Sequence, residues 1–274
     1  MNPLVSVIMP VHNNETTLLC ALDSIRHQTY RNLEIIVVDD ASTDHTKQIA
    51  GQYVTRDARV KVISAPDDPY RIDIKLERNV NAGWSARNAG LAIARGELIT
   101  FQDGDDASLL NRIEVQVGLL QKYNATHIIT GWQPFNEQLV GTILDLGSQK
   151  PPVPLFTPTQ LSALSQKTKG LVAKLSLALN AAVPFYFKRI RLINKLFFGS
   201  LESFPGAGNN PLFTREVLER VQFRPLKNRV WPSFMGRGAD RDFNFQVVET
   251  FKNSYFFDIP LYLWDTNPSR KPSL

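Results

Sequence analysis

The sequence has only one cysteine, Cys20, among its 274 residues. This excludes an internal disulfide framework and a zinc site built from several thiolates. So few thiols suit a reducing compartment, and we expect a cytoplasmic protein. The 43% hydrophobic and 21% charged residues are typical of a globular chain rather than of a disordered, collagenous or coiled-coil one.

Long hydrophobic runs are also missing. The N-terminus has neither the basic residues nor the apolar core of a secretory signal peptide. The most apolar stretch, residues 171–187, is interrupted by Lys174, Asn180 and Pro184. We therefore expect no membrane-spanning helix.

Acidic residues are absent from one long stretch, residues 146–201. The basic residues of this stretch give it a charge of +8 in a chain of net charge +5, and they are Lys150, Lys167, Lys169, Lys174, Lys188, Arg189, Arg191 and Lys195. Because the excess positive charge is local, we expect no nucleic-acid partner. Residues 185–198 mix aromatic, aliphatic and cationic side chains, as helices on anionic membranes do. We predict that residues 167–198 contact such a membrane surface; packing against the protein, and contact with an acceptor or a second subunit, are the alternatives.

Strand and helix patterns alternate over the first 130 residues. The apolar runs that predict strands are residues 5–9, 33–38, 60–63, 98–101 and 126–130. The segments with helical patterns or helix-start signals are residues 15–28, 42–56, 84–95 and 109–123. Repeated units of this kind predict an α/β fold, a Rossmann-type and mostly parallel sheet flanked by helices. No G-x-G-x-x-G or G-x-x-x-x-G-K-[ST] motif occurs, which disfavours a dehydrogenase and a P-loop enzyme.

The second half of the chain is less regular. Several prolines between residues 151 and 158 indicate a linker, and residues 131–150 are expected to be irregular or to form short strands. Residues 160–198 are expected to form two helices interrupted near Pro184, a helical insertion in the C-terminal half. Further helices are predicted near residues 215–221 and 239–251, with a strand near 255–259.

Polar or acidic residues follow three of the predicted strands, at residues 10–15, 39–40 and 103–106. Ligands of open α/β sheets bind at the carboxyl ends of strands, so we expect these loops to form one site. Asp103, Asp105 and Asp106 repel one another unless a cation neutralises them, and Mg²⁺ or Mn²⁺ prefers such oxygen ligands. The alternative is a solvated acidic turn whose Asp106 or Ser108 begins the next helix.

A longer resemblance includes these three clusters. Residues 5–15 and 28–44 resemble the opening elements of glycosyltransferase family 2, whose members have the GT-A fold. The most specific stretch, residues 83–106, is similar to the A-R-N-x-G-L and D-x-D-D signatures of that family. A weaker similarity resumes at residues 210–220 and at residues 238–243, which resemble the acidic motif of polysaccharide-polymerising members.

The resemblance implies a role for each matching residue. Asp103 and Asp105 match the D-x-D pair, which implies a Mn²⁺ or Mg²⁺ ion held against the donor diphosphate. Asp240 matches the general base; Asp242, or neither residue, is the alternative, since either carboxylate could simply stabilise a helix start. The residues matched to donor-nucleotide binding are Pro10, His12, Glu15, Asp40, Arg87 and Asp103.

The function implied is that of an inverting, metal-dependent glycosyltransferase. We expect a UDP-sugar as donor and a growing polysaccharide or a lipid-linked glycan as acceptor, with the enzyme peripheral at the inner face of the membrane. One GT-A-like domain would comprise a donor-binding half, residues 1–130, and an acceptor-binding half, residues 131–274. Two alternatives remain: a sugar-nucleotide-binding protein that does not need Asp240, and a sugar-phosphate nucleotidyltransferase, disfavoured because the N-terminus lacks the Gly-rich loop with Arg and Lys that holds a triphosphate.

Overall fold

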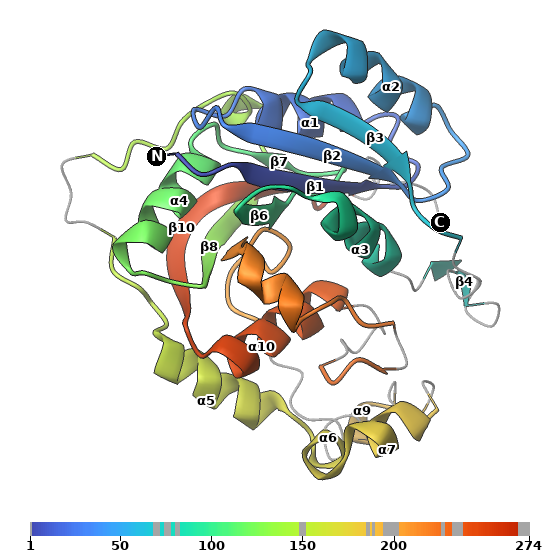
Figure 1. The fold of residues 1–274 in the computed structure, drawn as a ribbon, viewed down its shortest axis with the longest axis vertical. Coiled ribbons are helices and arrows are strands. Elements are labelled where there is room, and N and C mark those ends of the chain that lie inside the picture. The colour runs from blue at the N-terminus through green and yellow to red at the C-terminus, as the bar shows by residue number, and fades with distance from the viewer. Residues whose placement is uncertain are drawn as a thin grey trace.

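A computed structural model describes residues 2–67, 72–73, 78–79, 83–147, 152–184, 187, 190–193, 203–225, 228–231 and 238–267. Its main sheet has eight strands in the order β3-β2-β1-β6-β9-β8-β10-β7 (Figure 1). These strands are β1 (Val5–Val11), β2 (Leu33–Asp39), β3 (Val60–Ser64), β6 (Leu98–Phe101), β7 (Ala107–Ser108), β8 (His127–Pro134), β9 (Leu212–Thr214) and β10 (Ser254–Trp264). A separate two-stranded sheet pairs β4 (Ile72–Asp73) with β5 (Arg78–Asn79).

Helices cover both faces of the sheet, as predicted. Alternate side chains of a strand point to opposite faces, so Val7 and Met9 of β1 enter one apolar cluster and Ile8 enters another. The first cluster is completed by α1 (Leu18–Arg26), α2 (Thr46–Arg56) and α4 (Arg112–Lys122). The second is completed by α3 (Trp84–Ile93) and α10 (Ala239–Phe251), on the opposite side in Figure 1. Burial on both faces explains the uniformly apolar strands.

The expected mostly parallel sheet is confirmed. Strands β3, β2, β1 and β6 are parallel neighbours, and β8 is parallel to β10. The antiparallel exceptions are β9, between β6 and β8, and β7 at the edge. Strand β8 extends to Pro134, into the segment expected to be irregular or to form short strands, and the helix expected near residues 215–221 is a 3₁₀ helix over Arg215–Glu219.

A buried carboxylate on β2 connects its two neighbouring strands, β1 and β3. Glu34 of β2 is 2% exposed. It accepts hydrogen bonds from the Ser6 hydroxyl at 2.6 Å, from the backbone N–H of Arg95 at 2.5 Å and from the Lys61 ammonium at 3.2 Å. Burial raises the pKa of Glu34, but these bonds outweigh it and lower the pKa to about 2.

The described part of the predicted basic insertion is helical. It contains α5 (Pro158–Thr168), α6 (Leu171–Leu175), α7 (Leu177–Ala182) and the single turn α9 (Arg191–Ile193). They lie at the end of the molecule away from β3 (Figure 1). The expected interruption near Pro184 is present, since α7 ends at Ala182, but the segment before it forms three helices where one was expected. Most of residues 185–198 lies outside the described residues. Among the described helices, none combines the length and apolar character that a membrane span requires.

Candidate active site

The three polar loops meet at one edge of the sheet because β1 lies between β2 and β6. Val11 at the end of β1 pairs with Asp39 at the end of β2. On the other side, the Thr17 hydroxyl donates to the backbone oxygen of Gly104 at 2.8 Å and connects the first loop to the third. A Cβ at Gly104 would lie 2.8 Å from Val11 Cγ1, so only glycine allows this close approach. The predicted convergence at the carboxyl edge is therefore present.

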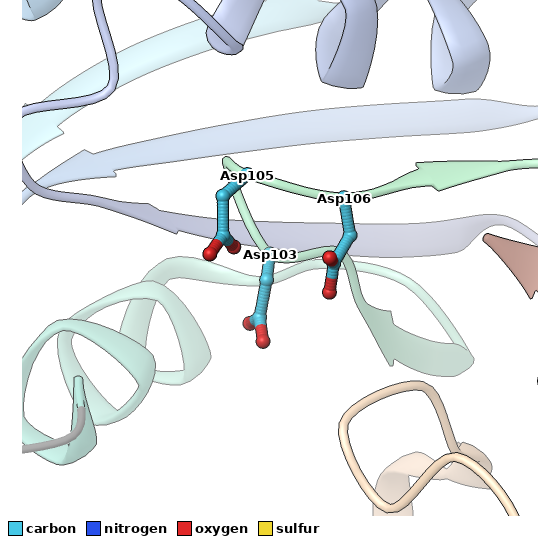
Figure 2. Close-up of side chains that lie close together, drawn as sticks. All are labelled: Asp103, Asp105 and Asp106. Atoms are coloured by element: carbon cyan, nitrogen blue, oxygen red, sulfur yellow. The ribbon is translucent and has the colours of Figure 1, made fainter. Parts of the chain in front are cut away.

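Three aspartates form an acidic cluster on the loop after β6. The carboxylates of Asp103, Asp105 and Asp106 project to the same side of the loop (Figure 2). One carboxylate oxygen from each lies within 4.8 Å of those of the other two. Asp103 and Asp105 are half-buried, whereas Asp106 is 3% exposed. The cluster opens outward at Asp103 and Asp105 and is closed behind by Asp106.

Asp106 is held from the C-terminal part of the chain. It accepts hydrogen bonds from the Tyr262 hydroxyl at 2.9 Å and from the backbone N–H of Asp265 at 2.8 Å. Burial, together with the negative charges of Asp105 and Asp103, raises its pKa well above the usual range. Asp106 does not begin helix α4, which starts at Arg112, so the alternative of a capping turn is wrong for this residue.

The donor set fits a hard divalent cation. Carboxylate oxygens are the ligands that Mg²⁺ and Mn²⁺ prefer, and one oxygen from each of the three side chains lies within 4.8 Å of the others. Asp103 and Asp105 are the two members open to the outside. The residues present therefore fit a divalent ion, and its binding by Asp103 and Asp105 stays a prediction.

Arg87 lies directly against this cluster. Its Nη2 donates to Asp103 Oδ1 at 2.5 Å, and the side chain of Arg87 is 7% exposed. The guanidinium carbon also lies 5.6 Å from the ring centre of Phe223 and 6.0 Å from that of Phe101. These contacts fix the guanidinium group of Arg87 beside the carboxylates, where it can interact with a phosphate group.

The residues matched to nucleobase and ribose binding lie at the ends of β1 and β2. The His12 ring Nδ1 is 2.7 Å from the backbone oxygen of Asp40, so these two predicted residues lie side by side. Pro10 lies near the end of β1 and is half-buried. The Glu15 carboxylate reaches across to His45, whose backbone N–H donates to it at 3.1 Å, and this bond lowers the pKa of Glu15. In this structure Glu15 thus holds the first loop to the start of α2.

The Gly-rich loop before β9, residues 205–210, connects the acidic cluster to Asp240. The Asn209 side-chain amide donates to Asp103 Oδ2 at 2.8 Å and to the Tyr262 hydroxyl at 3.0 Å. The neighbouring Gly208 lies beside Asp240, whose Oδ2 is 3.1 Å from the place a Cβ of Gly208 would occupy. The loop therefore contacts both Asp103 and the predicted base at the start of α10, two residues that are far apart in the sequence.

A buried polar chain positions this loop and the start of α10. The Asn244 amide donates to the backbone oxygens of Gly208 at 2.6 Å and Asp240 at 2.8 Å. Its oxygen must then accept from His127 Nε2, 3.0 Å away, which leaves His127 Nδ1 to accept from the Ser254 hydroxyl. Burial lowers the pKa of His127 to about 3, so the ring is neutral at ordinary pH.

Asp242, the rival of Asp240, is a structural residue. It is 0% exposed, and its Oδ1 accepts from the backbone N–H groups of Val230 at 2.7 Å and Trp231 at 3.1 Å. Its Oδ2 accepts from Arg224 at 3.0 Å and from Gln246 at 3.0 Å. A carboxylate with both oxygens engaged inside the protein has no access to a substrate hydroxyl. Asp240, by contrast, is half-buried and lies beside Gly208 of the Gly-rich loop.

A second arginine adds positive charge near Asp240. Arg229 is 0% exposed, and burial lowers its pKa to about 10. The negative charges of Asp242 and Asp240 act against this lowering, whereas the positive charge of Arg87 adds to it. The site therefore contains both arginines and carboxylates within electrostatic range of one another. The sequence contained no motif that would have identified Arg229.

Sequence reasoning also missed Asn209 and Tyr262. Asn209 lies in the Gly-rich loop, whose glycines and asparagines are typical of a turn but do not indicate a contact with Asp103. Gly206 in this loop has φ +75°, which permits the turn that brings Asn209 to the acidic cluster. Tyr262 lies in β10, where its position in the strand pattern gave no indication of its contact with Asp106.

Comparison with known proteins gives a consistent picture. The sequence profile described as glycosyl transferase family 2 matches residues 6–176. Glycosyltransferase GlyG of Streptococcus pneumoniae serotype 4 is 33% identical over 137 residues, which are 50% of this chain and 42% of that protein. The Escherichia coli protein named UDP-Glc:alpha-D-GlcNAc-diphosphoundecaprenol beta-1,3-glucosyltransferase WfgD is 32% identical over 137 residues, 50% of this chain and 49% of its own. The chain thus spans somewhat less than half the length of these curated relatives.

Two solved structures share the fold. The crystal structure of Staphylococcus aureus TarS 1–349 in complex with UDP has a TM-score of 0.55 at 18% identity, covering 97% of this chain and 62% of that one. Mannosyltransferase PcManGT from Pyrobaculum calidifontis, in complex with GDP-Man and Mn²⁺, has a TM-score of 0.56 at 16% identity, covering 98% of this chain and 58% of that one. At such identities the likeness establishes the fold alone.

Proposed function

Because the chain belongs to glycosyltransferase family 2, we propose that it transfers a sugar from a nucleotide-sugar, a UDP-sugar, to a hydroxyl of a polysaccharide or lipid-linked glycan. Transfer depends on Mn²⁺ or Mg²⁺ and inverts the anomeric carbon. The donor binds to residues 1–130 and the acceptor to residues 131–274. The observation that carries the proposal is that Arg87 and Asp105 lie against Asp103, and that one loop contacts both Asp103, through Asn209, and Asp240, through Gly208.

The chain's own residues divide the work of the reaction. Asp103 and Asp105 would hold the cation, which when bound supplies positive charge to the diphosphate leaving group. Arg87 adds a fixed positive charge to the same place. His12 and Asp40 lie where the nucleobase would bind, beside Pro10 at the end of β1.

Asp240 acts on the other reactant. It accepts the proton of the acceptor hydroxyl while that oxygen bonds to the anomeric carbon. The bond between the anomeric carbon and the diphosphate oxygen breaks, and its electron pair leaves with the diphosphate. One displacement of this kind inverts the anomeric centre. Asn244 and the Gly-rich loop fix the backbone that carries Asp240.

The nucleotide is assigned by analogy. TarS in complex with UDP supports a uridine nucleotide, whereas PcManGT in complex with GDP-Man makes a guanosine nucleotide the alternative to test. WfgD, by its name, acts on a diphosphoundecaprenol-linked sugar, which supports a lipid-linked acceptor for this chain.

Peripheral contact with an anionic membrane is part of the proposal. Four leucines of α6 and α7 are exposed by 48–69%, namely Leu171, Leu175, Leu177 and Leu179. An apolar surface beside basic residues supports membrane contact through residues 167–198. However, Lys169 is paired with Glu249 at 3.0 Å and contributes less free charge than the sequence suggested. Replacing Leu175 and Leu177 by serine should reduce co-sedimentation with phosphatidylglycerol vesicles at least severalfold; unchanged sedimentation would refute membrane contact through this surface.

Thermal shift measurements test the donor site. UDP, GDP, CDP and ADP would each be added with and without Mn²⁺, at about 100 times the dissociation constant, where binding adds about 2.7 kcal/mol. We expect a rise in melting temperature of several degrees with UDP that requires Mn²⁺. Asp105→Ala should abolish the rise, whereas Asp145→Ala, at an exposed carboxylate on another loop, should retain it. A rise that Asp105→Ala leaves intact would refute the metal assignment.

A further inference from the structure

Two tryptophans are exposed beside the acidic cluster. Trp132 of β8 is 42% exposed and Trp264 of β10 is 41% exposed. Their ring centres are 4.8 Å apart and their planes are at 89°. Because large aromatic side chains are mostly buried in proteins, an exposed pair in contact indicates a binding surface.

The strand register places this pair at the candidate active site. Trp132 is paired with Tyr262 in the parallel ladder of β8 and β10, which lie side by side in Figure 1. Tyr262 and Trp264 are two residues apart, so both lie on the same face as Trp132. The Tyr262 hydroxyl contacts Asp106 at 2.9 Å and Asn209 at 3.0 Å. One face of two strands therefore leads from the acidic cluster to the exposed rings.

A polar cavity adjoins the same strand ends. Its volume is about 720 Å³, and it is lined by residues 133–139 and 265–267. This volume lies within the range of about 300–1,000 Å³ that is typical of small-molecule sites. The lining includes the hydrogen-bonding side chains Gln133, Asn136, Glu137, Gln138, Asp265 and Asn267. The backbone of Asp265 also donates to Asp106, so the cavity borders the acidic cluster.

The charges around the tryptophans distinguish between partners. Residues 131–147 and 254–267 contain no lysine or arginine. They contain four acidic residues, Glu137, Asp145, Asp258 and Asp265. An anionic lipid surface or a nucleic acid would be repelled there, because both need compensating cations. A neutral sugar chain fits better: its C–H faces pack on indole rings, and its hydroxyls bond to amides and carboxylates.

We propose that Trp132 and Trp264 form a stacking platform for an uncharged glycan, which is the acceptor of the transfer reaction. The inference depends on the proposed function for the acceptor role, but not for glycan binding itself. The platform holds sugar rings next to the hydroxyl that approaches Asp240 and the donor. Specificity for the acceptor therefore resides in the ends of β8 and β10 and in the cavity beside them.

The test compares substitutions that differ in aromatic character. In the full chain, Trp132→Leu with Trp264→Leu keeps apolar surface but removes both rings, whereas Trp132→Phe with Trp264→Phe keeps a ring at each position. Leu19→Ala is the matched control, because Leu19 is 48% exposed on α1. All proteins would be screened on an array of neutral oligosaccharides of two to six units, and the strongest ligand would then be titrated by tryptophan fluorescence or calorimetry.

We expect the leucine pair to raise the dissociation constant for the glycan at least about 10-fold, which is about 1.4 kcal/mol. The phenylalanine pair should stay within about threefold of the unmodified protein, and Leu19→Ala should not change binding. The melting temperature and its rise with UDP and Mn²⁺ should be the same in all variants. These controls separate a lost platform from a damaged fold.

Three results would overturn the platform. In the first, the unmodified protein binds no glycan on the array although UDP binds. In the second, the leucine pair binds the glycan as well as the unmodified protein does. In the third, brominated phosphatidylglycerol vesicles quench the tryptophan fluorescence of the unmodified protein but not that of the leucine pair, which identifies a membrane contact of Trp132 and Trp264 instead. By contrast, glycan binding that needs both rings in a protein that binds no nucleotide would support the platform and refute the proposed function.

Discussion

Substituting Asp242 and Asp240 separately by asparagine distinguishes a structural carboxylate from a chemical one. Both changes conserve shape and remove one negative charge, and the two residues lie in the first turns of the same helix, α10. Asp242 is fully buried, whereas Asp240 is half-buried beside the Gly-rich loop. The two variants should therefore fail in opposite ways, one in stability and the other in turnover.

The cost of Asp242→Asn follows from its four accepted hydrogen bonds. An asparagine oxygen can still accept from the backbone of Val230 and Trp231, but its NH₂ group then faces the donors of Arg224 and Gln246. Losing one bond to a charged donor and one to a neutral donor costs about 2–4.5 kcal/mol. With an unfolding entropy of about 0.6 kcal/mol/K for 274 residues, a loss of about 3 kcal/mol lowers the melting temperature by about 5 °C.

Asp240→Asn should leave the fold almost unchanged. A carboxylate near a helix N-terminus contributes about 0.3–1 kcal/mol, so the melting temperature should fall by no more than about 2 °C. Turnover should be lost while the melting temperature still rises with UDP and Mn²⁺. Scanning calorimetry and radiolabelled sugar transfer measure both quantities. Near-normal turnover of Asp240→Asn would place the base elsewhere, and an Asp242→Asn protein as stable as the original would refute the structural role.

Three further predictions concern pH, packing and the site loop. The pKa of Glu34 is lower in the folded than in the unfolded protein, so the ionised carboxylate stabilises the fold above about pH 4.5. This contribution of about 3 kcal/mol should disappear as the pH falls from 5 towards 2. Urea unfolding of Glu34→Gln should show a weaker pH dependence over that range. Gly90→Ala should destabilise the protein by about 1–3 kcal/mol, because the new Cβ would lie 2.5 Å from Ile8 Cγ2. Gly118→Ala should stabilise it by about 0.5–1 kcal/mol, because Gly118 has open space around it. Equal effects of the two substitutions in urea unfolding would contradict this packing. Asn209→Ala should raise the Mn²⁺ concentration needed for half-maximal UDP binding severalfold, because Asp103 loses a hydrogen bond at 2.8 Å; an unchanged Mn²⁺ titration would show that Asn209 does not position Asp103.

The N-terminal half of the fold was predictable because each strand carries its own signal. Strands β1 and β2 are buried on both faces, and burial on both faces requires the continuous apolar runs seen in the sequence. Once the strands are parallel, their carboxyl ends must share an edge, so Asp40 and Asp103 could be assigned to one site without the structure. The order of strands and helices along the sequence was therefore enough to bring Asp40 and Asp103 to the same edge of the sheet.

The short strands carried no such signal. Strand β9 has three residues and is inserted antiparallel between β6 and β8, which are both distant in sequence. Its pairing depends on tertiary contacts rather than on its own composition. The same holds for Asn209, just before β9: its contact with Asp103 spans 106 positions, and no pattern within the loop specifies it.

The choice between Asp240 and Asp242 shows where sequence information ends. Side chains two positions apart on an α-helix point about 160° away from each other, so only one of the two can face the site. The resemblance favoured Asp240, but the local sequence offers two carboxylates at the same helix start. The structure adds the partners: donors from Arg224 and from the backbone of Val230 surround Asp242, and Gly208 lies beside Asp240. Because those partners come from other segments, the role of each carboxylate is fixed by packing and not by its place in the motif.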